Sequence, residues 1–569
     1  MSGWNGNQTR EPGLSVQARV VGAASGLLAA FAGVGAAEGV ASAISGPSPV
    51  VAVGTWAIDT SPAPLREWAI RNFGVDDKQV LVTGMLLTIA LLGALAGAIG
   101  VTHRRFAIGM TVAVGAAGLL AVMTARGLND PLLVRITPSL VALAVSTTAL
   151  ILLLRGLEEA AAAAALVEEQ TTAPTGLGAR LTPREAPAEA TTPALEQPAV
   201  MIPTRRPISL AADLAGGLDR RAFLRTAGVI GAVGVAGGAF WKLGEQGSYA
   251  TSGLITLPRP ASPAAVVGQA DFGIPGLTPY FTTNDDFYRI DTALVVPRLD
   301  HNTWSMKIHG LVDHPVTLRF DDLLKAPLIE RDVTLMCVSN EVGGYYNGTA
   351  RWLGVRVSDV LASVGIKPGA DAVKSTSSDG WTCGTPLSAL TDPSRDAMFA
   401  IGMNGQPLPY DHGFPARMVV PGLYGFVSAT KWITEFEVTR FDEFEAYWTS
   451  RGWSAQAPVK TQSRIEVPRP YRDVLTGQTE LAGMSWAVHR GVSKVEVLID
   501  DEPFVAQLAP WDNPDTWRQW RLPNWKATKG DHTIAVRATD ALGEVQTAKR
   551  ARPDPDGASG YHTVVLPVT

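Results

Sequence analysis

The sequence predicts a multidomain protein in which an N-terminal all-α transmembrane bundle precedes an α+β domain and a C-terminal immunoglobulin-like β-sandwich. Long apolar stretches fill the first part of the chain, short alternating strands rich in tryptophan and proline begin near residue 248, and regularly spaced short strands follow residue 468. A chain of 569 residues needs several cores, and its mean hydropathy of +0.12 is high for a purely soluble protein.

Four apolar stretches predict a membrane-spanning region over residues 1–155. Each approaches the ~20 residues that a spanning helix needs. All are rich in small and apolar residues, as close-packed transmembrane helices are. Buried soluble helices are the alternative, which is disfavoured because the stretches have almost no polar face. The predicted spans are Val16–Ile44, Val80–Val101, Phe106–Ala125 and Leu132–Leu154.

Basic residues at the ends of these stretches predict their orientation. Arg10 precedes the first stretch, Arg104 and Arg105 join the second to the third, and Arg155 follows the fourth. Loops rich in Lys and Arg stay in the cytoplasm, so both ends of this region are expected there.

Two further segments separate the membrane region from the rest of the chain. In residues 156–217, a helix over Gly156–Gln170 leads into a Pro-, Ala-, Thr- and Glu-rich stretch without apolar periodicity, which predicts a disordered linker. Residues 218–245 resemble a twin-arginine export signal, with Arg220 and Arg221 before a Gly/Ala/Val run. A fifth transmembrane helix is the alternative. No small-residue cleavage site is evident, so a retained helix is favoured, and either alternative places the following domains outside the cytoplasm.

Charge and cysteine content exclude several classes of function. A net charge of −5 gives no argument for nucleic-acid binding. Two cysteines, Cys337 and Cys383, are too few for a disulfide framework, a four-cysteine zinc site or an iron–sulfur cluster, and CxxCH is absent. His103 is the only histidine of the membrane region. No haem or iron–sulfur cluster is therefore predicted, and any redox function would need a separate electron carrier, a cytochrome or a membrane redox protein.

The pattern beyond the export signal predicts two domains, residues 246–467 and 468–569. Strands in the first are expected over Trp304–Val312, Val316–Phe320 and Glu330–Cys337, with short helices over Phe320–Ala326 and Val357–Gly365. In the second, Ser493–Asp500 alternates strictly, and His532–Ala548 predicts a strand, a turn and a second strand.

Cys337 is the first candidate for chemistry. It is either a small buried apolar residue, or a nucleophile that needs a nearby base, or a thiolate ligand to a soft or high-valent metal. The glycine-rich stretch that follows suits close approach of main chain to a ligand. Further along, Met403–Trp432 is crowded with Gly, Pro, His, Arg and Lys, which suits an anionic ligand. Arg417 and Lys431 would meet a phosphate, and glycine N–H groups would cradle it.

With these motifs, Thr278–Arg464 resembles the molybdenum-cofactor domain of the sulfite oxidase family. APVKTQSRIEVP (Ala457–Pro468) resembles the segment that leads into that family's immunoglobulin-like dimerisation domain, which implies a homodimer. The matching pieces are Cys337 after a strand, TARWLGVRVSDVL (Thr349–Leu361), SSDGWTCGTPL (Ser377–Leu387) and NGQPLPYDHGFPARMVVPGLYGFVSATKW (Asn404–Trp432).

The resemblance implies a five-coordinate molybdenum that carries a pyranopterin dithiolene, oxo groups and the thiolate of Cys337. It also implies catalytic roles for Cys337, Arg351 and Tyr424. Arg351 would bind an oxyanion through two parallel hydrogen bonds, or would form a surface salt bridge; both alternatives stay open. Tyr424 is a candidate pocket aromatic, and Tyr345, Tyr346 and Trp453 are the alternatives. The implied cofactor-binding residues are Asn284, Cys337, Asp379, His412, Arg417, Gly422, Gly425, Ser428 and Lys431.

Two features depart from the family pattern. Sulfite oxidases usually carry a glycine–asparagine pair and paired arginines after the cysteine, whereas Val338, Ser339, Asn340 and Glu341 stand here. The reduced positive charge puts sulfite in doubt as the substrate. Cys383 is a structural cysteine, a disulfide partner of Cys337 or a second metal ligand, and the first is favoured.

The predicted function is that of a membrane-anchored, extracytoplasmic, molybdopterin-dependent oxidoreductase, which transfers an oxygen atom and two electrons on a small oxo-substrate. One alternative keeps the cofactor and makes the chain a reductase of S-oxides or N-oxides, of the methionine sulfoxide type. The other is a non-catalytic envelope binding module. Retention of Cys337 and of the run through Lys431 argues against this second alternative.

Overall fold

The computed structural model describes residues 16–44, 46–62, 65, 68–69, 72–73, 77–124, 131–172, 224–235, 255–265, 268, 270–469, 474, 476–510 and 513–569. The chain forms two compact units, one made of residues 1–57, 79–125 and 130–244 and the other of residues 58–78, 126–129 and 245–569. The predicted linker after residue 172 and most of the export signal lie outside the described residues.

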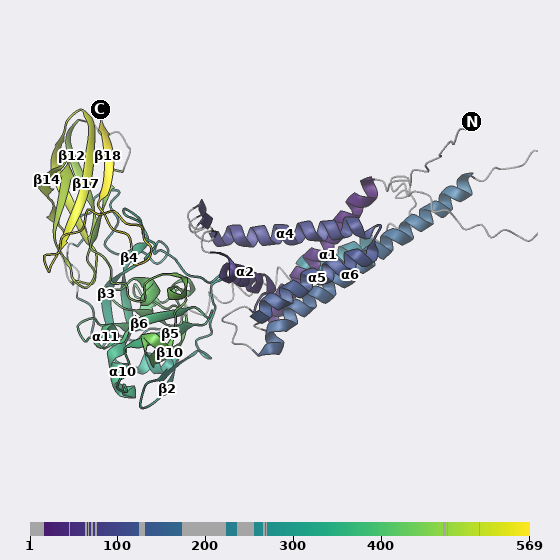
Figure 1. The fold of residues 1–569 in the computed structure, drawn as a ribbon, viewed down its shortest axis with the longest axis horizontal. Coiled ribbons are helices and arrows are strands. Elements are labelled where there is room, and N and C mark those ends of the chain that lie inside the picture. Colours follow the sequence, from purple (N-terminus) through teal and green to yellow (C-terminus); the bar gives the residue numbers. More distant parts are fainter. Residues whose placement is uncertain are drawn as a thin grey trace, which may run out of the picture. The chain divides into compact units, whose positions relative to one another are not determined.

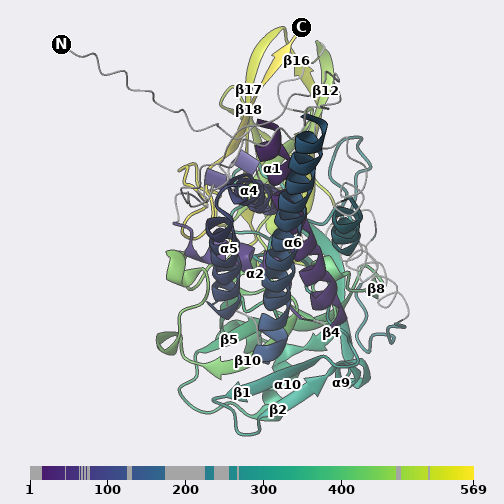
Figure 2. The same ribbon diagram turned by 90° about the vertical axis from the view of Figure 1, so that its right-hand side faces the viewer.

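The helices of the first unit confirm the four predicted apolar stretches. Four helices are long and apolar enough to cross a membrane, namely Val16–Ala43, Lys78–Gly100, Arg104–Thr124 and Leu132–Glu159. Glycines let the backbones of α1 and α4 approach closely, because a Cβ at Gly26 or Gly97 would meet main-chain atoms of the other helix. The helices, labelled in Figures 1 and 2, are α1 (Val16–Ala43), α2 (Pro49–Thr60), α4 (Asp77–Gly100), α5 (Arg104–Thr124) and α6 (Leu132–Thr172).

Helix α6 is longer than predicted. The fourth apolar stretch and the helix expected over Gly156–Gln170 form one uninterrupted helix, Leu132–Thr172. No proline or capping residue separates them, and the alanine run favours continuation, since alanine has the highest helix propensity. Of the predicted fifth span, the structure describes an apolar helix over Leu224–Val235, which is shorter than a membrane crossing.

The α+β domain of the second unit holds two sheets, and the strands and helices predicted for it are present. The first sheet has strand order β2-β1-β10-β5-β6 and the second β3-β4-β7-β8, with β9 paired to β7. Only the β1–β10 pair is parallel among these strands. The strands are β1 (Ser305–Gly310), β2 (Val316–Arg319), β3 (Leu328–Met336), β4 (Asn347–Arg356), β5 (Ala372–Ser377), β6 (Thr382–Pro386), β7 (Met398–Met403), β8 (Gln406–Pro407), β9 (Arg417–Val419) and β10 (Ile433–Thr439).

Short helices connect these strands, and their apolar faces join the core of the domain. Phe320, Leu361 and Leu390, one from each α-helix, are fully buried among strand residues such as Phe436. The helices are α9 (Phe320–Lys325), α10 (Val357–Val364) and α11 (Leu387–Thr391), with single 3₁₀ turns η2 (Tyr410–His412), η3 (Gly425–Val427), η4 (Phe441–Glu443) and η5 (Thr449–Arg451).

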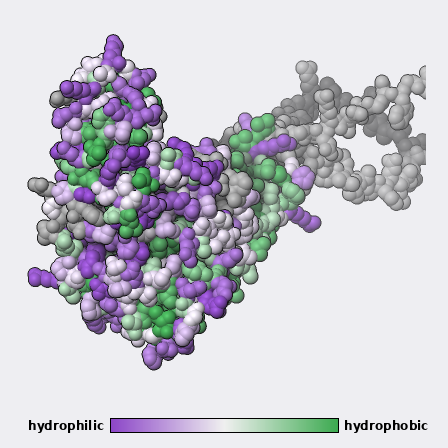
Figure 3. Space-filling view, turned by 60° about the vertical axis from the view of Figure 1, so that its left-hand side comes forward, coloured by the Kyte–Doolittle hydropathy of each residue, from purple (hydrophilic) through white to green (hydrophobic). Residues whose placement is uncertain are grey.

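The C-terminal strands form two antiparallel four-stranded sheets, as predicted for a sandwich, and are coloured yellow-green to yellow in Figure 1. Leu481 and Trp520 of one sheet pack against Val497 and Val536 of the other in a shared core. The sheets are β11 (Gln462–Val467), β12 (Gly477–Trp486), β16 (Arg518–Ala527) and β15 (Gln507–Leu508), and β14 (Glu502–Val505), β13 (Val492–Ile499), β17 (Gly530–Asp540) and β18 (His562–Val568). Hydrophilic and hydrophobic residues are interspersed over the β-rich surface in Figure 3, as expected where a surface faces water.

The strand predicted at the end of His532–Ala548 does not form. Beyond Asp540 only an isolated bridge joins Thr539 to Val545. The buried side chain of Gln546 replaces the missing ladder, because its Oε1 accepts the N–H of Ala538 at 3.0 Å and its Nε2 donates to the carbonyl of Gly560 at 2.8 Å.

Hydrogen bonds tie the sandwich to strand β3, which ends directly before Cys337. The main-chain N–H of Thr334 donates to the carbonyl of Asp515 at 2.9 Å. In return, the main-chain N–H of Trp517 donates to Oγ1 of Thr334 at 2.7 Å. The sandwich therefore supports the strand that presents the cysteine.

This support predicts the effect of Thr334→Val. The substitution leaves the buried N–H of Trp517 and the hydroxyl of Thr349, 2.5 Å from Thr334 Oγ1, without a partner. An unsatisfied buried donor costs about 1–3 kcal/mol. We expect a lower midpoint of thermal unfolding, followed by tryptophan fluorescence, whereas Thr563→Val on the exposed face of β18 serves as the unchanged control. Equal midpoints for the two variants would contradict the assigned support.

Candidate functional site

Cys337 is the first residue of the tight loop between β3 and β4. Its main-chain N–H donates to the carbonyl of Tyr346 at 2.9 Å, and Oδ1 of Asn340 accepts the N–H of Tyr346 at 2.8 Å. The sulfur lies 2.8 Å from Oγ of Ser339. Burial raises the pKa of the Cys337 thiol, which the neighbouring Ser339 hydroxyl partly offsets. The loop thus holds one thiol in a defined position.

Two tyrosines, the buried Tyr424 and the partly buried Tyr288, flank this thiol. Burial raises the pKa of Tyr288 and of Tyr424, and the charge of a Cys337 thiolate acts on both in the same direction. Gly425 lies beside them, since a Cβ built there would be 3.6 Å from the carbonyl of Met336 and 4.0 Å from the hydroxyl of Tyr288. The predicted residues Cys337, Tyr424 and Gly425 therefore come together, and sequence reasoning missed Tyr288.

The predicted histidine and asparagine form a second group. Nε2 of His412 is 2.8 Å from the carbonyl of Asn284, and Nδ2 of Asn404 donates to Oδ1 of Asn284 at 2.9 Å. Burial lowers the pKa of His412 to about 4, so the ring is neutral near pH 7. A carbonyl partner requires the proton on Nε2, which leaves the lone pair of Nδ1 available as an acceptor.

Arg417, at the start of β9, is a buried cation. Its Nη1 donates to the carbonyl of His412 at 3.1 Å, and its Nε to the carbonyl of Met418 at 3.4 Å. The guanidinium lies 5.0 Å from the ring centre of Trp352. Burial lowers the pKa of Arg417 to about 10, so it stays charged at neutral pH. Within the described ranges no carboxylate forms an ion pair with it.

Lys431 is the second buried cation of the site. Its Nζ donates to Oδ2 of Asp291 at 2.6 Å and to the carbonyl of Asp411 at 3.1 Å. Burial lowers the pKa of Lys431 to about 8, against the opposing effect of Asp291. Burial alone would raise the pKa of Asp291, but its cationic neighbours hold it well below its usual range. Burial raises the pKa of Asp379, and the Asp291 charge adds to the effect.

Comparison with known proteins identifies the family of the chain. Residues 293–448 match the family model described as the oxidoreductase molybdopterin binding domain. The uncharacterized oxidoreductase YuiH of Bacillus subtilis is 33% identical over 154 residues, which cover 27% of this chain and 74% of YuiH. The chain belongs to the sulfite oxidase family of molybdopterin-binding oxidoreductases.

Human mitochondrial sulfite oxidase, a further relative, is 31% identical over 293 residues, 43% of this chain and 53% of the human protein. The chain thus spans about half the length of the sulfite oxidases that it matches. Among solved structures, the sulfane dehydrogenase SoxCD from Paracoccus pantotrophus is 21% identical with a TM-score of 0.45, covering 51% of this chain and 82% of that chain.

The buried cations fit the anionic cofactor of this family. Isolating a charge such as that of Arg417 from water costs several kcal/mol unless an opposite charge compensates it. Lys431 shares its one carboxylate, Asp291, with Arg289, whose Nε lies 3.0 Å from Oδ2. A phosphate group would supply the missing negative charge. A free thiol at Cys337 is the donor type that a soft metal prefers.

Three other predicted residues, Arg351, Ser428 and Gly422, form hydrogen bonds with residues other than Cys337, Arg417 and Lys431. Arg351 forms the salt bridge that was one of its two alternatives, with Nε and Nη2 at 2.7 and 2.9 Å from the buried carboxylate of Asp332. Ser428 donates to the carbonyl of Tyr424 at 2.9 Å. Gly422 has a φ of +80°, its carbonyl accepts the N–H of Val459, and a Cβ there would meet His489 of the sandwich. On β4, Arg351 lies four residues, about 13 Å, from Asn347, which pairs with Met336, the residue before Cys337.

Cys383 is fully buried, and its sulfur is 3.7 Å from Oγ1 of Thr385. Both cysteines are free thiols, so the disulfide alternative is not formed. Burial raises the pKa of Cys383 to about 11, which keeps its thiol protonated near pH 7. These properties agree with the structural role that was favoured.

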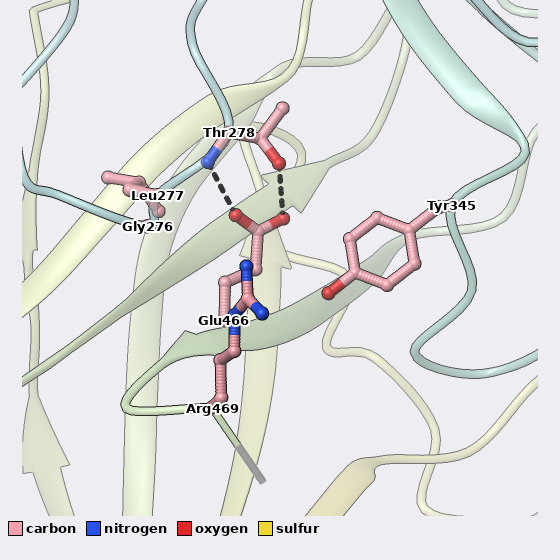
Figure 4. A pocket seen from close by; sticks show the side chains of 6 residues that line it. All are labelled: Gly276, Leu277, Thr278, Tyr345, Glu466 and Arg469. Atoms are coloured by element: carbon pink, nitrogen blue, oxygen red, sulfur yellow. Dashed lines mark hydrogen bonds between the residues drawn. The ribbon is translucent and has the colours of Figure 1, made fainter. Parts of the chain in front are cut away.

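A cavity of about 570 Å³ opens between the α+β domain and the first strand of the sandwich (Figure 4). Tyr345, from the loop that follows Cys337, lines one side. The carboxylate of Glu466 accepts from the N–H and the hydroxyl of Thr278 at 2.7 and 2.9 Å. The lining residues are Gly276, Leu277, Thr278, Tyr345, Glu466 and Arg469.

Arg464 connects this cavity to the cysteine loop. Its buried guanidinium donates to Glu466 at 2.7 Å, to Oδ1 of Asn347 at 3.0 Å and to the carbonyl of Gly344. Strand β11 of the sandwich therefore fixes the far end of the loop that begins at Cys337.

Because Arg417 has no carboxylate partner within the described ranges, replacing it should weaken cofactor binding without destabilising the cofactor-free protein. In Arg417→Met we expect several-fold less molybdenum per chain, measured by elemental analysis, because the phosphate loses its buried cation. In protein made without cofactor, we expect equal or higher thermal stability, because an uncompensated buried charge is removed.

Arg440→Met is the matched control, since the Arg440 side chain is half-exposed and paired with Asp442. Unchanged molybdenum content in Arg417→Met would contradict the assignment of this arginine to the cofactor.

Proposed function

We propose that the chain is a membrane-anchored, extracytoplasmic oxidoreductase that transfers an oxygen atom and two electrons on a small oxo-substrate at a molybdopterin centre. The proposal rests on the presence of a free thiol, Cys337, and of two buried cations, Arg417 and Lys431, in one domain. Arg417 has no carboxylate partner within the described ranges. When bound, the molybdenum cofactor supplies the two-electron redox change and the site of oxygen-atom transfer.

The residues around the thiol have separate tasks in this mechanism. Cys337 would ligate the metal as a thiolate, which metal binding favours by releasing the proton. The Ser339 hydroxyl, 2.8 Å from the sulfur, would donate to that thiolate and stabilise its charge. Tyr288 and Tyr424 stay protonated because their pKa values are raised, so they offer O–H donors and aromatic walls that exclude water.

The cofactor-holding end uses charge and neutral hydrogen bonds. Arg417 and Lys431 would bind the phosphate of the pterin, which is why two cations are buried there. Neutral His412, held by the carbonyl of Asn284, would present Nδ1 as an acceptor to the pterin. We also propose Asp379 and Ser428 as cofactor contacts. Asp379 is proposed because it lies beside Asp291 and Lys431.

Charge near the metal end favours the reductase of S-oxides or N-oxides as a second candidate. Glu341 stands in the cysteine loop, whereas Arg351 is neutralised by Asp332 and Arg464 by Glu466. A neutral oxo-substrate needs no cationic clamp, whereas a sulfite dianion does. Both candidates use the same cofactor and differ in the direction of oxygen transfer.

The four long apolar helices support multi-pass anchoring in the cell membrane. The basic residues at their ends and the export-signal resemblance support an extracytoplasmic position of the catalytic domain. A separate cytochrome or membrane redox protein would exchange electrons with the centre, and the sandwich would mediate a homodimer as in the family.

Cys337→Ser in the full chain tests the metal ligand. We expect about one molybdenum per chain in the wild type, and in the variant an altered or lost molybdenum signal in electron paramagnetic resonance, because a hydroxyl is a harder donor than a thiolate. Cys383→Ser is the control, since this buried thiol has no assigned ligand role. Absence of molybdenum from wild-type protein made in a cofactor-competent host would leave the binding module as the better hypothesis.

Substrate class can be tested on the same preparations. With reduced and oxidised dyes as electron partners, we expect turnover of neutral S-oxides to exceed turnover of sulfite. Arg351→Met should lower thermal stability, because it leaves Asp332 buried and unpaired, and should lower both turnovers by the same factor. A selective rise in the KM for sulfite in this variant would instead assign Arg351 to the substrate.

A further inference from the structure

Residues 58–78, between the first two long apolar helices, belong to the same compact unit as the α+β domain. The end of this segment contacts the candidate cofactor site. Nζ of Lys78 forms an ion pair with Oδ1 of Asp291 and donates to the carbonyl of Ala293 at 2.8 Å. The Lys78 side chain is 22% exposed and that of Asp291 only 5%, so the ion pair is largely shielded from water.

The start of the segment is held as well. The carboxylate of Asp59 accepts from the hydroxyl of Tyr447 at 3.1 Å and from Nη2 of Arg451 at 3.3 Å. The guanidinium of Arg451 lies 3.6 Å from the ring centre of Tyr447, and the Arg451 and Asp59 side chains are 12% and 15% exposed. Two separate contacts, at residues 59 and 78, therefore join this segment to the α+β domain.

Asp291 links Lys78 to the site. Its Oδ1 faces Lys78, while its Oδ2 receives Lys431 at 2.6 Å and Arg289 at 3.0 Å. Oδ1 of Asp411, whose side chain is half-exposed, also lies 3.8 Å from Nη1 of Arg289. Three cations therefore surround Asp291, which orients Lys431 and shares its negative charge among them. Lys431 is thereby held ready for a second, anionic partner.

We propose that Lys78 is a positioning residue of the cofactor site, which acts through Asp291 on the place and the charge of Lys431. The proposal rests on the proposed molybdopterin function of that site. It has two consequences. The segment over residues 58–78 lies on the same side of the membrane as the α+β domain, and a chain that begins after the linker lacks part of its cofactor site.

The contact itself can be tested without any cofactor. Asp59→Cys and Arg451→Cys are introduced into the full chain together with a protease site in the linker, between residues 180 and 190. After treatment of membranes with a short bismaleimide and cleavage of the linker, we expect the two fragments to stay joined on a denaturing gel. The control pairs Asp59→Cys with Arg552→Cys on the exposed sandwich, and native Cys337 and Cys383 are present in both. Separation of the fragments in both variants would overturn the proposal.

The effect on the site is tested with Lys78→Met in the full chain. We expect several-fold less molybdenum per chain, with the wild-type content largely restored in Lys78→Arg, which keeps the charge. Lys529→Met, at an exposed turn of the sandwich, is the control. The cofactor-free forms should unfold at the same temperature, which separates a positioning effect from a loss of fold.

The outcomes distinguish this proposal from the function on which it rests. Wild-type molybdenum content in Lys78→Met, with molybdenum present in the wild type, overturns the role of Lys78 and leaves the proposed function intact. Absence of molybdenum from every variant, wild type included, removes the proposed function and this role with it, while the cross-link still decides whether the segment contacts the domain.

Discussion

The burial of Arg417 is the constraint on which the candidate site depends. A guanidinium without a carboxylate partner is stable inside a protein only if other groups compensate it. Here the carbonyls of His412 and Met418 and the face of Trp352 compensate in part. His412 and Met418 are close to Arg417 in sequence, whereas Trp352 belongs to β4, so β4 must pack against the segment from η2 to β9 to surround the cation. The remaining deficit of negative charge is the basis for the proposal that an anionic group of the cofactor lies beside Arg417.

The sandwich and the α+β domain cooperate in presenting Cys337. Strand β3 is hydrogen-bonded to the segment before β16 through Thr334, and the loop after the cysteine is fixed by Arg464 of β11. Arg464 is itself held by Glu466, which bonds to Thr278. The thiol that we propose as a metal ligand is thus held from both sides, as a ligand must be to keep its position. The sandwich is therefore part of the scaffold that holds Cys337.

Sequence reasoning located the elements that carry a strong local signal. The apolar stretches follow from length and composition alone, and the run through Lys431 marks His412 and Arg417 because few other structures need that mixture of residues. Tyr288, Arg289 and Asp291 were missed, since they lie in irregular chain where no periodicity distinguishes them. The pairing of Arg351 with Asp332 depends on the register of β3 against β4, and the contact between Lys78 and Asp291 joins residues far apart in sequence. Such contacts become visible only when the chain is folded.

The distribution of carboxylates among the cations bears on the substrate. At the cofactor-holding end, Arg417 has no carboxylate partner in the described part of the chain, and Lys431 shares Asp291 with two other cations. Arg464, which holds the loop after Cys337, and Arg351, about 13 Å along β4 from the end of that loop, each have a buried carboxylate of their own. Excess positive charge is thus concentrated where a phosphate would lie and reduced where a substrate would approach Cys337. An anionic substrate would gain little from this arrangement, whereas an uncharged S-oxide or N-oxide would lose nothing, which is the basis for proposing the reductase as the second candidate.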